Sequence, residues 1–111
     1  HPHPQRRRQR QMCIRDRLEC ISRLKQKHNF RFILHFVVQR ENYHEMEDII
    51  DLGRRYGADR VWLNRITDWQ TYSDFSWHDV VAPEHPEHSK FQHEFARIKT
   101  ADNYVGYATL E

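Results

Sequence analysis

One segment limits the possible folds of this chain more than any other. Residues 30–38 read FRFILHFVV, rich in aromatic and β-branched side chains and without Gly or Pro. Because side chains alternate across a strand, one face of this segment is entirely apolar: Phe30, Phe32, Leu34, Phe36 and Val38. The other face is mixed: Arg31, Ile33, His35, Val37 and Gln39. Near-continuous apolarity is typical of a parallel strand covered on both sides. We expect the apolar face to pack on helices and the mixed face to line a partly polar cavity.

The residues after this strand predict a helix and then a second strand. Asn42 and Glu45 have the spacing of a capping box, and the helix that they open extends to about Tyr56. Gly57 suits a left-handed helix stop. One buried stripe is expected at helical spacing: Met46, Ile49, Ile50 and Gly53. The second strand is predicted at Val61–Ile66, so the unit has two parallel strands joined by a right-handed crossover.

Further helices flank this unit. A helix is expected from Leu18 to about His28, and residues 67–83 form an irregular aromatic segment. A last helix covers about Glu87–Ile98, and the end of the chain, NYVGYATLE, alternates weakly as a strand does. The fold class that we expect is therefore α/β, a fragment of a partial parallel β/α barrel in which a βαβα unit is preceded by a helix.

The basic residues are concentrated in the first seventeen positions. Residues 1–17 carry six Arg against one Asp, whereas residues 18–111 have a net charge of −3. Low complexity without a hydrophobic period predicts disorder for residues 1–17. The Arg6–Arg10 block could bind RNA phosphates without specificity. However, RRRQRQMCIRDR resembles translated sequencing-adapter text, so we interpret residues 1–17 as an artefactual tail and residues 18–111 as the body.

Composition excludes several classes of protein. The acidic body argues against a specific nucleic-acid-binding face. No apolar run reaches the roughly 18–20 residues that span a bilayer, and no secretory signal is recognisable, so a cytoplasmic location is the default expectation. Cys13 and Cys20 fit neither a zinc ribbon nor a redox motif, which predicts two free thiols.

The predicted strand ends give a candidate ligand site. Parallel α/β proteins bind ligands at the carboxyl ends of their strands, here residues 39–42 and 66–69. From the mixed faces, His35, Gln39 and Asn64 would face a shared cavity. Purely structural roles stay open for the same region, with Asn42 as a helix cap, His35 as a hydrogen-bonded core residue, and Thr67 and Asp68 in a turn.

The segment from Phe30 to Trp69 resembles one protein family. The FVVQ-x-x-N pattern at residues 36–42, the YGAD turn at 56–59 and the Trp-containing loop after the second strand are similar to strand five, its helix and strand six of the radical S-adenosylmethionine (SAM) barrel. The subgroup with twitch or SPASM extensions is the most similar, and FSWHDVVAPEHPEH extends the resemblance to about residue 88. Gln70 departs from the pattern, because the family carries Gly after the Trp.

The resemblance implies a partial β/α barrel in which a 4Fe-4S cluster, held by a CxxxCxxC loop, binds SAM and cleaves it reductively. By position it implies SAM contacts from His35 and Gln39 and adenine contacts near Ile66 and Thr67. This chain contains no CxxxCxxC, so the catalytic cluster and the first strands belong to a missing N-terminal barrel half. We expect this chain alone to bind neither cofactor. Its parent's substrate, a peptide or a small molecule, is not specified.

Two other functions remain open. The aromatic loop Trp69–Trp77 could present a hydrophobic patch to a partner chain, which would make this a non-catalytic interaction module. A metal-binding domain is the second alternative, because several potential zinc or nickel ligands lie within a short span: His78, Asp79, Glu84, His85, His88 and His93. Their spacing matches no known zinc pattern.

Overall fold

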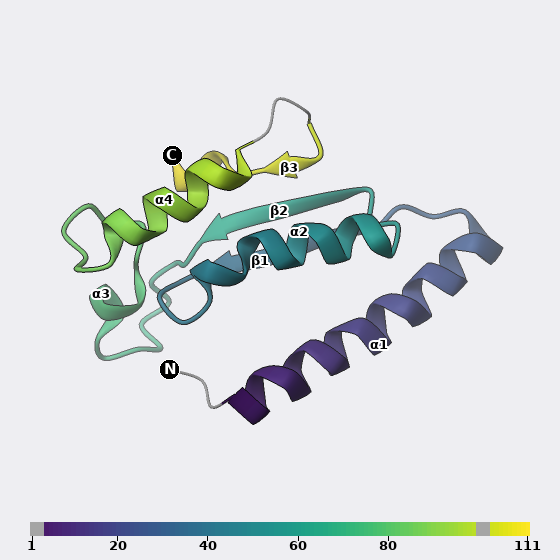
Figure 1. Cartoon of the computed structure of the whole chain (residues 1–111), viewed down its shortest axis with the longest axis horizontal. Coiled ribbons are helices and arrows are strands. Elements are labelled where there is room, and N and C mark those ends of the chain that lie inside the picture. Colours follow the sequence, from purple (N-terminus) through teal and green to yellow (C-terminus); the bar gives the residue numbers. More distant parts are fainter. Residues whose placement is uncertain (1–3, 100–102) are drawn as a thin grey trace.

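The computed structural model describes residues 4–99 and 103–111, with side chains from Cys13 onward. Along these residues the order of elements is α1 (Pro4–His28), β1 (Ile33–Val38), the 3-10 turn η1 (Tyr43–Glu45), α2 (Met46–Arg55), β2 (Arg60–Arg65), α3 (Phe75–His78), α4 (His88–Ile98), β3 (Val105–Gly106) and the 3-10 turn η2 (Ala108–Leu110) (Figure 1). No helix of the described residues is long and apolar enough to cross a membrane.

The three strands form one parallel sheet in the order β1-β2-β3. In this register Ile33 lies opposite Arg60 and Val38 opposite Arg65, so β1 and β2 end level with each other. The helix α2 connects β1 to β2, whereas α3 and α4 connect β2 to the short β3. The α/β class and the parallel strand–helix–strand unit are confirmed. Three strands cannot close a barrel, so the barrel itself stays a prediction.

The hydrophobic core lies between one face of the sheet and the helices α2 and α4 (Figure 1). The strands contribute Val38, Val61 and Leu63, all fully buried. The helices contribute the two stripes expected from their periodicity: Met46, Ile49 and Ile50 from α2, and Phe91, Phe95 and Ile98 from α4. Each such side chain contributes about 1.5–3 kcal/mol when it leaves water, so these two stripes hold the helices on the sheet.

Two glycines have the roles that their positions predicted. A Cβ at Gly53 would lie 2.6 Å from Cγ2 of Val61 and 3.0 Å from the Tyr104 hydroxyl, so a side chain there would separate α2 from the sheet. Gly57 has a φ of 79° and ends the helix, in the left-handed region that glycine adopts without steric cost.

The opposite face of the sheet, which we call the open face, is formed by Ile33, His35 and Val37 of β1 and by Arg60, Trp62 and Asn64 of β2. Within residues 4–99 and 103–111 no helix packs on it, and Ile33 and Val37 are 45% and 47% exposed. The expectation of a strand covered on both faces is therefore wrong for this part of the chain. Of the two predicted faces, the apolar one packs on helices and the mixed one is uncovered.

The N-terminal helix is longer than the sequence analysis predicted. It begins at Pro4 rather than Leu18, which contradicts the expected disorder for residues 4–17, whereas residues 1–3 lie outside the described part. Pro4 suits the first helical position, and residues 5–28 contain no Gly or further Pro and many Arg and Gln, which are good helix formers. Leu18 is buried, and Lys25 bonds Asp59 Oδ2 at 2.6 Å, so α1 is fastened to the body.

The boundaries of the central unit also differ in detail. The first strand begins at Ile33 rather than Phe30, and the second covers residues 60–65 rather than 61–66. The helix opens with the turn η1, and the Asn42 side chain makes no cap hydrogen bond, so the predicted capping box is wrong. Its amide instead accepts from the Gln39 N–H at 2.9 Å and donates to the Val37 carbonyl at 2.9 Å. The reason is local, because the chain turns back immediately after β1 and brings these backbone groups within reach of Asn42.

Candidate functional site

The centre of the open face is a polar and aromatic group on the two long strands. Nδ2 of Asn64 lies 3.2 Å from Nδ1 of His35, so the amide fixes the orientation of the imidazole and leaves its Nε2 directed away from that contact. The His35 and Trp62 rings are nearly parallel, at an interplanar angle of 13° and a centroid separation of 6.5 Å. The group can therefore offer an aromatic surface and a hydrogen-bonding nitrogen to a ligand on this side.

Trp62 lies across the sheet because β3 carries a glycine beside it. A Cβ at Gly106 would be 2.5 Å from Cε3 of Trp62, so no larger residue would allow the indole its position. The Arg60 guanidinium lies over the Trp62 ring, 4.6 Å from the ring centroid. Nε of Arg60 is buried, and no hydrogen-bond partner for it occurs among the described residues.

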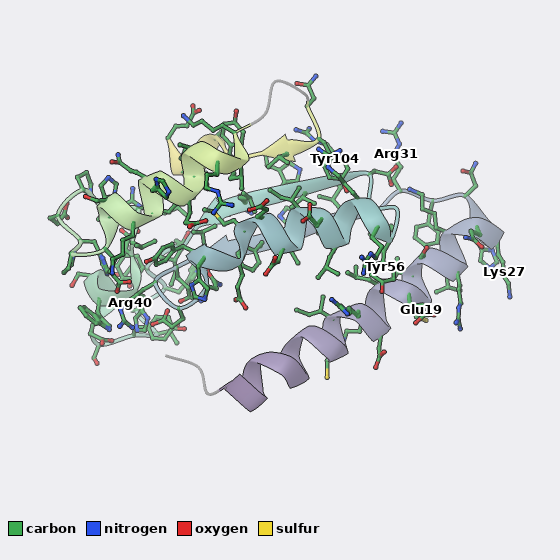
Figure 2. All side chains as sticks on the ribbon, viewed as in Figure 1. Glu19, Lys27, Arg31, Arg40, Tyr56 and Tyr104 are labelled. Carbon is green, nitrogen blue, oxygen red and sulfur yellow. The ribbon has the colours of Figure 1, made fainter. Side chains whose placement is uncertain are left out.

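The carboxyl ends of the strands carry a second polar group, which we call the rim cluster: Arg40, Glu41, Tyr43, Trp77, His78 and Glu87. Nε of Arg40 donates to Oε2 of Glu87 at 2.8 Å, and the Tyr43 hydroxyl donates to Oε1 of Glu87 at 3.0 Å. The guanidinium of Arg40 also lies 4.2 Å from the Trp77 ring centroid. Figure 2 shows Arg40 near α3, at the end of the sheet opposite to Arg31 and Tyr104.

The rim cluster shifts the proton affinity of its members. Burial alone would raise the pKa of Glu87, but the hydrogen bonds from Tyr43 and Arg40 outweigh it and lower that pKa below its ordinary value. Burial and the hydrogen bond to Glu87 raise the pKa of Tyr43 to about 12. Glu87 is therefore an ionised acceptor at neutral pH and Tyr43 a neutral donor, so this pair has a structural role.

The loop between β2 and α4 is fastened to the rim at several points. The Arg40 N–H donates to the His78 carbonyl at 2.9 Å, and Nδ1 of His78 lies 2.7 Å from Oε1 of Glu41. At the end of β2, Arg65 makes a two-point ion pair with the buried Asp79, at 3.0 and 2.6 Å. The hydrogen bond to Asp79 raises the pKa of Arg65, so its charge is permanent. This loop therefore has a fixed path over the strand ends.

The turn at the start of this loop contains a residue in the left-handed region of the backbone, which favours glycine. Gln70 has a φ of 63°, and its N–H donates to Oδ1 of Asp68 at 2.8 Å. Beside the turn, Trp69 is 80% exposed, and Tyr72 and Trp77 are 44% and 43% exposed.

The four site residues inferred from the sequence fall in different surroundings. His35 is exposed on the open face, and the structure brings it together with Asn64 as expected. Gln39 is half-buried just beyond β1, with its N–H on the Asn42 amide. Ile66 is buried, and Thr67 is exposed one residue further on.

Two features of the site were missed by reasoning from the sequence. The first is Trp62, whose place opposite His35 depends on the register of the two strands. The second is the bond from Arg40 to Glu87, which joins positions 47 residues apart. The alternation of the second strand could have indicated Trp62, whereas no local signal indicates the partner of Arg40.

The histidines of residues 78–93 do not form a metal centre in the described structure. Among the described residues, no group of three His, Cys, Asp or Glu side chains is placed to hold a metal ion. Nε2 of the buried His85 lies 2.7 Å from the Trp77 carbonyl, and its Nδ1 accepts from the Glu87 N–H. Nδ1 of His88 lies 3.1 Å from the Val80 carbonyl. These imidazoles hold the loop in place.

Comparison of the chain with protein-family models, with curated proteins and with solved structures gives no match.

Proposed function

We propose that this chain is the C-terminal part of a radical SAM enzyme barrel and that its open face is one wall of the cavity that holds SAM. The observation that supports this is the two-sidedness of the sheet. One face is packed under α2 and α4, whereas the other is bare and carries the His35, Trp62 and Asn64 group. A barrel has this division between an outer layer of helices and an inner face.

The residues of this chain fit SAM but not the iron–sulfur cluster. The open face supplies an aromatic surface and polar groups, and the level ends of β1 and β2 supply the rim at which such folds bind ligands. A 4Fe-4S cluster needs cysteine thiolates brought together, whereas Cys13 and Cys20 are both exposed on α1. The cluster would therefore be held by the missing half, and this chain would bind and orient SAM, with His35, Gln39, Ile66 and Thr67 as its contacts.

The DNA that precedes the codon for Leu18 tests the proposal. We expect an open reading frame that encodes CxxxCxxC about 100 residues upstream, since each strand–helix unit takes roughly 30 residues. A genuine start codon near residue 1 would overturn the proposal.

The assignment of the open face as one wall of the SAM cavity is tested in the intact enzyme, by equilibrium dialysis with SAM. His35→Ala and Asn64→Ala are expected to weaken SAM binding about tenfold, because each loses part of one hydrogen-bonded pair at the ligand surface. Asp51→Ala, on the exposed side of α2, is the matched control and should leave binding unchanged. Unchanged affinity in both open-face variants would contradict the assignment of this face.

A non-catalytic interaction module is the second candidate, favoured by the exposure of Trp69 near the start of the loop between β2 and α4. It predicts that the intact protein is a stable, folded complex partner without any cofactor. Ultraviolet–visible absorption of the protein purified without oxygen separates the two functions, because only the radical SAM enzyme has the broad absorption of an iron–sulfur cluster.

A further inference from the structure

A cavity lies on the helix-covered side of the sheet, between α4 and the turn η2 (Figure 1). Its volume is about 710 Å³, within the range of roughly 300–1,000 Å³ in which small-molecule sites fall. Its apolar floor is formed by Phe91 and Phe95 of α4, Leu110 of η2 and Val81 of the preceding loop. All four side chains are buried members of the hydrophobic core, so the floor has a fixed position.

The walls of this cavity are joined to each other. The Arg65 N–H donates to Oγ1 of Thr109 at 2.9 Å, which connects the end of β2 to η2. The Phe91 and Phe95 rings are nearly parallel, at an interplanar angle of 10° and a centroid separation of 5.6 Å. The Phe95 ring also meets the Tyr107 ring edge to face at 5.3 Å. The cavity therefore has its shape without a ligand, which lowers the entropy cost of binding one.

Arg65 places a fixed hydrogen-bond donor beside the apolar floor. Because side chains alternate along β2, Arg65 lies on the same side as the buried Val61 and Leu63, and it lines the cavity. Asp79 accepts from Nε and Nη2 of Arg65 at 3.0 and 2.6 Å, which holds the guanidinium in one orientation. Among the described residues, Nη1 of Arg65 donates no hydrogen bond. The guanidinium thus keeps a donor for an anion, in a planar geometry that suits carboxylate and phosphate groups.

Lys99 supplies a second positive charge at the same cavity. Its Nζ lies 4.8 Å from the centroid of the Phe95 ring, so the ammonium stands next to the apolar floor. The carboxylate of Glu111 lies 3.7 Å from this Nζ, and both side chains are about half exposed. Exposed ion pairs of this kind are weak, so another anion can compete with Glu111 for Lys99. The permanent charges of the lining are Arg65 and Lys99 against Glu111, which favours an anionic ligand.

We propose that this cavity binds a small ligand with one anionic group and an apolar body. The anion, a carboxylate or a phosphate monoester, pairs with Arg65 and Lys99, and the body lies on the apolar floor. His88 also lines the cavity, and because its Nδ1 faces the Val80 carbonyl, its Nε2 can accept from a ligand hydroxyl. The site lies on the side of the sheet opposite to His35, so it is separate from the proposed SAM wall and does not depend on the radical SAM assignment.

Isothermal titration calorimetry of the 111-residue chain with octanoate and with octyl phosphate tests the site. We expect one ligand per chain with a Kd of roughly 0.1–1 mM, the range for a ligand of about ten heavy atoms. The tighter of the two probes identifies the anion that the site prefers. Octanamide, which has the same length and no charge, should bind at least about fivefold more weakly. Octanamide binding as tight as that of both anions, or no saturable binding of either anion, would overturn the proposal.

A pair of lysine variants tests the anion contact. Lys99→Gln should weaken octanoate binding about fivefold, because the ligand loses one charged partner. Lys90→Gln is the matched control, since it removes the same charge from an exposed position of α4 outside the cavity, and it should leave the affinity unchanged. Lys99 is chosen because Arg65 also holds Asp79, so its replacement would disturb the loop as well as the ligand. Equal affinities of the two variants would overturn the anion contact.

A pair of phenylalanine variants tests the place of the apolar body. Ala96 is exposed on α4 and lines the cavity, so the phenyl group of Ala96→Phe would occupy the ligand's space and should abolish octanoate binding. His93→Phe, at an exposed position of the same helix outside the cavity, is the control and should bind as the unmodified chain does. Unchanged octanoate affinity in Ala96→Phe would overturn the assignment of the cavity.

The outcomes distinguish this inference from the proposed function. His35→Ala should leave octanoate binding unchanged, and its loss in that variant would show that the probe binds the open face, which would overturn the proposal. An intact protein that binds octanoate but not SAM would remove the radical SAM assignment and support the cavity. Octanoate binding by the chain but not by the intact protein would show that the rest of the protein covers the cavity, and would overturn the proposal.

Discussion

Gln70 holds a backbone conformation that side chains with a Cβ rarely adopt, at a φ of 63°. Left-handed backbone costs such residues about 1–2 kcal/mol, and glycine avoids that cost. We therefore expect Gln70→Gly to stabilise the chain by about 0.5–1 kcal/mol, measured by urea unfolding. Gln92→Gly, at an exposed position within α4, is the control and should destabilise by about 1 kcal/mol. Destabilisation by both variants would contradict the strain at Gln70.

Glu87 makes stability depend on pH in the acid range. Because its pKa is lower in the folded chain than its ordinary 4.5, its stabilising effect is present above pH 4.5 and is lost as the pH falls through the folded-state value. Glu87→Gln should cost about 1 kcal/mol at pH 7, because the hydrogen bonds from Tyr43 and Arg40 lose their charged acceptor, and little at pH 3. Glu84→Gln, exposed and nearby, is the control. Thermal melts at both pH values measure the difference, and an equal cost at both would contradict it.

For single residues, the sequence predicted the face on which a side chain lies more reliably than it predicted the hydrogen-bond partner of that side chain. His35 and Asn64 could be assigned to one face because alternation is a local property of a strand. The bonds of Asn42 could not be predicted, since a helix cap and a strand-edge contact require the same short polar side chain. Which of these two contacts Asn42 makes depends on the path of the chain after β1, and only the folded structure shows that path.

At the scale of the element, the close contact between α2 and the sheet depends on the absence of a side chain at Gly53. Gly53→Ala adds a helix-favouring residue, worth about 1 kcal/mol, but its Cβ would clash with Val61 at 2.6 Å and crowd Tyr104. Overpacking in a dense core costs about 1–3 kcal/mol, so we expect net destabilisation of about 1 kcal/mol. Asp51→Ala, exposed on the same helix, should change stability by less than about 0.5 kcal/mol. A stabilised Gly53→Ala variant in chemical unfolding would show that α2 can move outward.

Periodicity predicted α2, α4 and both long strands because each has enough apolar residues to show a face. It failed for the first half of α1, where Arg and Gln favour a helix without forming an apolar stripe. The strand β3, only two residues long, is held by its pairing with Val61 and Trp62. Such an element is determined by its neighbours, so the weak alternation of the last residues could indicate it but not its bounds.

Over the whole molecule, the uncovered face of the sheet has a measurable consequence for the isolated chain. Ile33 and Val37 expose nearly half of their surface beside Trp62, and apolar surface of this kind drives association in water. We expect the 111-residue chain to self-associate through this face, with a mass above that of a monomer in light scattering. The intact protein, in which the proposed barrel would enclose the face, should stay monomeric. Val37→Lys should shift the chain toward the monomer, and Leu24→Lys, equally exposed but on α1, should not. A monomeric wild-type chain with cooperative melting would show that the face is stable in water, and would count against a barrel that encloses it.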